Sequence, residues 1–97
     1  MSAGFEWDPF KAALNLRKHG VSFYEAMTVF WDDEGVLIHD LEHSIGEDRF
    51  LLLGLSAASR ILAVVHCERR DGETIRIISA RKANSREHDL YTARRRS

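Results

Sequence analysis

The 97-residue chain has one cysteine and one proline, and it has no apolar run approaching the length of a membrane-spanning helix. A single cysteine cannot form an internal disulfide, so Cys67 is expected to be a buried free thiol in a reducing compartment. Residues 1–6 lack the basic and apolar regions of a secretory signal. These absences predict a cytoplasmic protein that does not enter a membrane.

Motifs for metal and nucleotide binding are also missing. The five histidines are scattered along the chain, and the lone cysteine has no partner at the spacing of a metal site. Neither a Walker loop nor a glycine-rich dinucleotide fingerprint occurs. We therefore expect neither a metal nor a cofactor.

The composition is that of one small globular domain, residues 1–97, with 44% apolar and 30% charged residues. Its net charge of −1 hides an asymmetry between the two halves. Residues 1–48 carry three Lys/Arg and ten Asp/Glu (3 − 10 = −7), whereas residues 49–97 carry eleven and five (11 − 5 = +6). Either the basic half attracts a polyanion, or the two halves neutralise each other across the folded surface.

Local patterns predict eight elements in the order β-α-α-β-β-β-β-α. Strands are expected at residues 5–7, 36–38, 50–55, 61–67 and 74–80, with Asp71-Gly72 as a hairpin signal. The helix signals are Asp8-Pro9 with Gly20 as a stop, a capping box at Ser22 and Glu25, and a capping box at Asn84 and Glu87. This order predicts an α+β domain in which two N-terminal helices and one C-terminal helix accompany an antiparallel meander sheet.

The first helix is expected to be amphipathic. Phe10, Ala13 and Leu14 fall on one of its faces, and Lys11, Asn15 and Lys18 fall on another. The apolar face should then pack on the sheet.

The most informative segment is residues 75–87, which is typical of a strand that delivers cations to the start of a capped helix. Arg76 lies within the strand, Arg81 and Lys82 lie at its end, and Arg86 opens the helix. Fixed cations in this arrangement suit a phosphate or a carboxylate. An ideal strand would place Arg76 and Arg81 on opposite faces, unless a strand end or a bulge at Arg81 brings them together.

Each of these side chains also has an ordinary structural interpretation. Arg76 would then be a solvated cation on the strand, and Arg86 would pair with a neighbouring acid such as Glu87. Tyr91, one turn after Glu87, either donates a proton or stacks on a base, or it packs its ring and hydrogen-bonds its hydroxyl.

Two places could supply acid–base chemistry. His66 and Glu68 share a strand face, and a histidine titrates near neutrality. The alternative is that His66 is a histidine of the core. Lys18 and His19 form the second place, although cations are also favourable at a helix C-terminus for electrostatic reasons alone.

Three groups of residues in order resemble one known family. They are Phe5-Glu6-Trp7-Asp8-Pro9, then Asn15 with Lys18-His19-Gly20-Val21-Ser22-Phe23, and finally residues 75–83 with Arg86-Glu87 and Tyr91. The chain resembles the BrnT toxins of bacterial type II toxin–antitoxin systems. The resemblance implies a RelE-like fold, RNA cleavage that blocks translation, and a DNA-binding, BrnA-like antitoxin. It also marks Lys18 and His19 as site residues.

Together these observations predict a ribonuclease toxin that acts without a metal, through attack of a 2′-hydroxyl on the adjacent phosphate. The predicted catalytic residues are Arg81, Arg76, His66 and His19, and the predicted RNA-binding residues are Lys18, Lys82, Arg86 and Tyr91. The rival interpretation is a non-catalytic binding module that uses the same cations to hold a protein or a nucleic acid. Either a homodimer or a toxin–antitoxin hetero-oligomer is compatible with the sequence.

Overall fold

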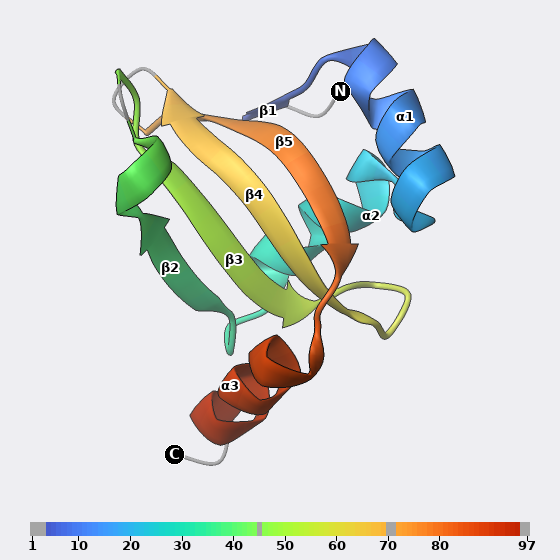
Figure 1. Ribbon diagram of the computed structural model, residues 1–97, viewed down its shortest axis with the longest axis vertical. Helices are drawn as coiled ribbons and strands as arrows, with labels where there is room; N and C mark the ends of the chain where they lie inside the picture. Colours follow the sequence, from blue (N-terminus) through green and yellow to red (C-terminus); the bar gives the residue numbers. More distant parts are fainter. Residues whose placement is uncertain (1–3, 45, 70–71, 96–97) are drawn as a thin grey trace.

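A mixed five-stranded sheet forms the centre of the computed structural model, which describes residues 4–44, 46–69 and 72–95 (Figure 1). The strands lie in the order β1-β5-β4-β3-β2. They are β1 (Phe5–Glu6), β2 (Val36–Asp40), β3 (Arg49–Leu55), β4 (Ile61–Arg69) and β5 (Thr74–Lys82). The helices are α1 (Pro9–His19), α2 (Phe23–Thr28) and α3 (Ser85–Arg95), with the short 3₁₀ helices η1 (Val29–Trp31) and η2 (Leu41–His43).

The predicted α+β class, element order and meander are confirmed. Strands β2 to β5 pair antiparallel in sequence order, and β1 adds a short strand that runs parallel to β5. This parallel pair places Phe5 opposite Ile75 and Glu6 opposite Arg76. The predicted hairpin falls between β4 and β5, but its residue Asp71 lies outside the described residues.

The predicted helix signals act as expected. The Asp8 side chain accepts a hydrogen bond from the Phe10 amide at 2.8 Å, and Gly20 ends α1 in the left-handed conformation at φ 70°. The Ser22 hydroxyl accepts from the Glu25 amide at 3.0 Å and begins α2. These caps fix the lengths of two helices that must fit against one face of the sheet.

The hydrophobic core lies between that face and the helices α1 and α2 with η1 (Figure 1). Its fully buried members include Val21, Phe23, Ala26, Val29, Leu62, Val64, Ile77 and Ala80. Each large apolar side chain buried here contributes roughly 1.5–3 kcal/mol relative to exposure. Against the other face, called the open face here, α3 packs at the ends of β2 and β3.

The prediction that α1 packs the face with Phe10 and Leu14 on the sheet is wrong. Phe10 and Leu14 are 72% and 48% exposed, whereas Ala12 and Asn15 turn inward. The face that turns inward instead carries the Asn15 amide, which satisfies the buried backbone groups of Val21 and Ala80.

A β-bulge in β5 decides which side chains reach the open face. Ile77 pairs with His66, and Ser79 pairs with Val65, so Ile78 is an extra residue. Ile77 and Ala80 consequently both face the core although they are three residues apart.

Candidate functional site

The bulge places Arg76 and Arg81 on the same face of the sheet. Arg76 pairs across the strands with Cys67, and Arg81 pairs with Ala63, both on the open face. The bulge lies at Ile78 and not at Arg81. It nevertheless has the effect expected of a bulge at Arg81, because it turns both arginines to the same face. They remain about 13 Å apart along β5, so each would contact a different phosphate.

Arg81 is held in one direction by Glu87. Its Nη1 and Nη2 donate to the two carboxylate oxygens of Glu87 at 2.7 and 3.0 Å, and Nη1 also donates to the Lys82 carbonyl at 3.4 Å. A guanidinium has five N–H groups, so the Nε–H and one Nη2–H are left for a ligand. The side chain is 40% exposed, which leaves these donors accessible.

Glu87 is itself fixed by the start of α3. Its Oε1 accepts from the Asn84 amide at 2.9 Å, and its own amide donates to Asn84 Oδ1 at 2.9 Å, which confirms the predicted capping box. Pairing with Arg81 holds the pKa of this nearly buried carboxyl below its ordinary value. Glu87 is therefore a poor proton acceptor and acts to orient Arg81.

The last turn of α1 is anchored beside the end of β5. The Asn15 side chain donates to the carbonyls of Ala80 (2.8 Å) and Val21 (3.0 Å), and it accepts from the Ala80 amide at 3.1 Å. Because Lys18 and His19 follow Asn15 by about one turn, they lie on the part of α1 that is held next to Ala80, the residue before Arg81.

Five of the eight predicted site residues lie at the end of α1, at the end of β5 and at the start of α3, three segments connected by the Asn15–Ala80 and Arg81–Glu87 hydrogen bonds. We call this group the basic corner, and it consists of Lys18, His19, Arg81, Lys82 and Arg86. Lys18, Lys82 and Arg86 are exposed, and His19 and Arg81 are partly exposed. Within the described residues, Arg86 forms no ion pair, so the expected bridge to Glu87 is replaced by the pair of Glu87 with Arg81.

Arg76 lies apart from this corner. Its Nη1 donates to Glu6 Oε2 at 2.8 Å, and Arg69 Nε approaches the same oxygen at 3.6 Å. One carboxylate thus serves two arginines, and the trio keeps one positive charge on the open face.

His66 lies on the opposite, helix-covered face and is 2% exposed. Its ring packs between Phe30 and Phe50, with centroid distances of 4.8 and 5.7 Å. Burial lowers its pKa to about 4, so the ring is neutral near pH 7. Glu68 shares this face, as predicted, but the sheet separates both side chains from Arg81. The geometry fits the alternative of a core histidine.

Tyr91 is likewise used inside the fold. It is 1% exposed, and its hydroxyl donates to Asp32 Oδ2 at 2.5 Å. Burial, together with the Asp32 carboxylate, raises the pKa of Tyr91 to about 12. Tyr91 therefore holds α3 against the η1–β2 turn, which positions the start of α3 and with it Glu87.

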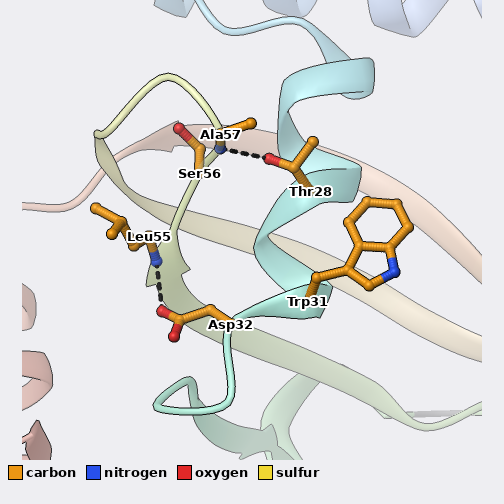
Figure 2. A pocket seen from close by; sticks show the side chains of 6 residues that line it. All are labelled: Thr28, Trp31, Asp32, Leu55, Ser56 and Ala57. Carbon is orange, nitrogen blue, oxygen red and sulfur yellow. Dashed lines mark hydrogen bonds between the residues drawn. The ribbon is translucent and has the colours of Figure 1, made fainter.

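Asp32 also anchors the loop between β3 and β4. Figure 2 shows its carboxylate accepting from the Leu55 amide at 2.8 Å, while Thr28 Oγ1 accepts from the Ala57 amide at 2.8 Å. These residues line a hollow of about 370 Å³ from which Trp31 projects, 63% exposed. The polar groups of this hollow are occupied in holding the loop, in contrast to the free donors of the basic corner.

Sequence reasoning missed two residues that build the site. Glu87 was expected as a helix cap or a partner of Arg86, and Asn15 as a polar residue of the first helix and part of a family pattern. The available signal for Glu87 was its place in the sequence, three residues after the cap residue Asn84 and six after Arg81. An asparagine on an otherwise well-formed helix, one turn before its end, was the signal for Asn15.

Among the described residues there is neither a metal site nor a membrane-spanning helix. In the described part of the chain, no three His, Cys, Asp or Glu side chains converge as metal ligands would. None of the described helices has the length and apolar character needed to span a membrane.

Comparison with known proteins identifies the family to which the chain belongs. Residues 7–87 match the family described as the ribonuclease toxin, BrnT, of type II toxin–antitoxin systems. No individual curated protein matches the chain. The matched span contains the basic corner, Asn15 and Glu87, and it covers most of the chain. The chain belongs to the BrnT family of ribonuclease toxins of type II toxin–antitoxin systems.

Proposed function

We propose that the basic corner is the place where this toxin binds and cleaves RNA, and that it does so without a metal. The observation that carries the proposal is that four cations and one partly exposed histidine lie at the end of α1, the end of β5 and the start of α3, which Asn15 and Glu87 connect through β5. Cleavage of RNA would stop translation and growth of the host cell.

The proposed reaction begins with attack of an RNA 2′-hydroxyl on the adjacent phosphorus. His19 takes the hydroxyl proton, the bond from phosphorus to the 5′-oxygen breaks as that oxygen takes up a proton from water, and a cyclic phosphate remains on the upstream fragment. Negative charge builds on the phosphate oxygens, and Arg81 can meet it with the two N–H groups that Glu87 leaves free. Lys18, Lys82 and Arg86 hold neighbouring phosphates, and Arg76 holds one farther along the open face.

His19 suits the proton transfer better than His66. His19 lies one turn after Asn15 at the basic corner and is partly exposed. His66 lies in the core on the other side of the sheet, and its low pKa makes it a weak base.

The antitoxin is the second part of the proposal. We infer that it is a BrnA-like, DNA-binding protein that neutralises the toxin by covering Arg81, which would exclude RNA directly. The two proteins would form a hetero-oligomer.

Cleavage of a defined RNA by the purified toxin, in the presence of excess chelator, tests the reaction. We expect cleavage to persist, and the upstream product should carry a cyclic phosphate. The matched control is the same RNA with a 2′-deoxy nucleotide at the cleaved position, which should remain intact. Cleavage of the 2′-deoxy RNA, or loss of cleavage on chelation, would contradict the proposed reaction.

A further inference from the structure

Strand β2 presents an unprotected edge of the sheet. It lies last in the strand order and pairs only with β3, in regular register over all five of its residues (Figure 1). Natural edge strands are usually protected by a lysine, a proline, a bulge or a cover. β2 contains no lysine or proline, and no bulge interrupts its pairing with β3.

The edge also exposes large apolar side chains. Leu37 is 55% exposed, Ile38 is 37% exposed, and Leu41 just beyond the strand is 78% exposed. Leu37 and Ile38 point to opposite faces, so both sides of the edge are apolar. Such a surface is a site for pairing with another extended chain.

Negative charge surrounds this edge. Residues 32–48 contain seven acids and neither lysine nor arginine, a segment we call the acidic edge. The ion pairs within its described part join acids to histidines only, at His39–Asp48 and His43–Asp40. The charge is thus largely uncompensated, and it would repel RNA and a second copy of the same strand.

A hollow connects the acidic edge to the proposed active site. It measures about 400 Å³ and runs over Ile38, Leu51 and Val65 on the open face to Arg81. A strand added outside β2 would direct every second side chain toward the open face, above this hollow. A strand bound to β2 would therefore lie at one end of the hollow, and the chain that continues from it could reach Arg81 at the other end.

We propose that β2 binds an extended segment of the antitoxin, which adds a sixth strand to the sheet and alternates apolar residues with lysine or arginine. The cations would point to the open face and meet Asp40 and Glu42 where these line the hollow, and the apolar residues would contact Leu37 on the other face. The inference rests on the proposed inhibition by covering Arg81, but strand addition is measured independently of RNA cleavage.

A fluorescent peptide that alternates valine with lysine tests the proposal on the intact toxin. We expect saturable binding by anisotropy, with slowed amide exchange in β2. The same peptide with alternate amides N-methylated should not bind, because it cannot form the strand ladder. Absence of binding by the first peptide, or equal binding by both, would overturn strand addition.

Charge reversal provides the matched control on the protein. Glu42 and Glu73 are both exposed, but Glu73 directly precedes β5, which β4 and β3 separate from β2 in the sheet. Glu42→Lys should weaken peptide binding about fivefold at low salt, and Glu73→Lys should leave it unchanged. Equal effects of the two substitutions would overturn the proposed site, as would a toxin dimer whose β2 amides are protected. If the toxin proves inactive on RNA, the peptide result still decides the docking surface.

Discussion

At the scale of single residues, the basic corner depends on a carboxylate that gives one arginine a fixed direction. Glu87 uses both oxygens on Arg81 while it caps α3, so the guanidinium is held by a rigid element and not by its own flexible chain. Preorganised donors of this kind stabilise charge that appears only in the transition state. The two candidate bases, His19 and His66, differ mainly in position, since His19 lies at the end of α1 and His66 lies in the core.

Substitution of each histidine should separate their roles. His19→Gln is expected to slow RNA cleavage by about 10²–10⁴-fold, because a general base is removed. His66→Phe is expected to leave the cleavage rate unchanged, since this ring packs between Phe30 and Phe50 on the other face. Single-turnover rates with both folded variants provide the measurement. Loss of cleavage in His66→Phe alone would reassign the base.

His66 should instead appear in the pH dependence of stability. Burial lowers its pKa from 6.5 to about 4 in the folded protein. As pH falls between these values, the unfolded chain takes up a proton that the folded chain does not, so this contribution to the folding free energy is lost. Urea unfolding across this range should show a steeper loss of stability in the wild type than in His66→Phe. Parallel curves for the two proteins would show that His66 does not titrate as a buried group.

At the scale of elements, the contact between α1 and β5 positions the end of α1, which carries Lys18 and His19. One asparagine side chain satisfies the amide and the carbonyl of Ala80 and the carbonyl of Val21, all within the core. The helix C-terminus with Lys18 and His19 is therefore placed by a polar contact.

Asn15→Ala should destabilise the protein by roughly 2–4 kcal/mol, because it leaves buried backbone groups without partners. The folded fraction should also cleave RNA more slowly, since the end of α1 loses its anchor. Lys11→Ala, at an exposed position of the same helix, is the control and should change stability by less than about 0.5 kcal/mol. Urea unfolding measures both variants, and equal stabilities would refute the anchoring role of Asn15.

Elements with strong local signals were predictable from the sequence. The caps at Asp8, Ser22 and Asn84 are satisfied by neighbours within three residues, so local chemistry decides them. The parallel strand β1 was not expected to pair with β5, because that pairing joins residues about 70 positions apart.

The site was predictable only in part. The cations at the end of β5 follow one another in sequence, and family resemblance added Lys18 and His19. The bulge at Ile78 could not be read from an alternating pattern, because a bulge shifts that pattern only where packing demands it. The face of α1 that turns inward could not be predicted either, because it depends on the contact of Asn15 with Ala80 in a distant strand.

At the scale of the whole molecule, the two oppositely charged halves are only partly neutralised. Among the described residues, three ion pairs cross between the halves, joining Glu6 to Arg69 and Arg76, and Glu25 to Arg60. The acidic edge and the basic corner remain as separate surfaces of opposite sign. This division suits the proposed inhibition, in which an antitoxin segment bound at the acidic edge leads across the open face to Arg81.

The C-terminal cations provide a test of this electrostatic division. Arg94 and Arg95 end α3, and Arg96 lies outside the described residues. Deletion of residues 94–97 should weaken RNA binding at low salt and reduce the salt slope of log affinity by roughly 0.7 for each phosphate that the tail no longer neutralises. The cleavage position should not change. An unchanged slope would show that the tail does not touch RNA, and a shifted position would show that it helps to select the site.

The most direct test of the central claim is the rate of RNA cleavage, in excess chelator, after Arg81 is removed without leaving its buried partner charged. In Arg81→Ala/Glu87→Gln the glutamine can still cap α3, so the protein should stay folded while cleavage falls by about 10²–10³-fold. Glu87→Gln alone should slow cleavage less than the double variant does, because Arg81 keeps its charge but loses one of the two carboxylate oxygens that fix its direction. Arg76→Ala should weaken RNA binding without slowing cleavage at saturation. Undiminished cleavage by the folded double variant would contradict the assignment of the active site to the basic corner.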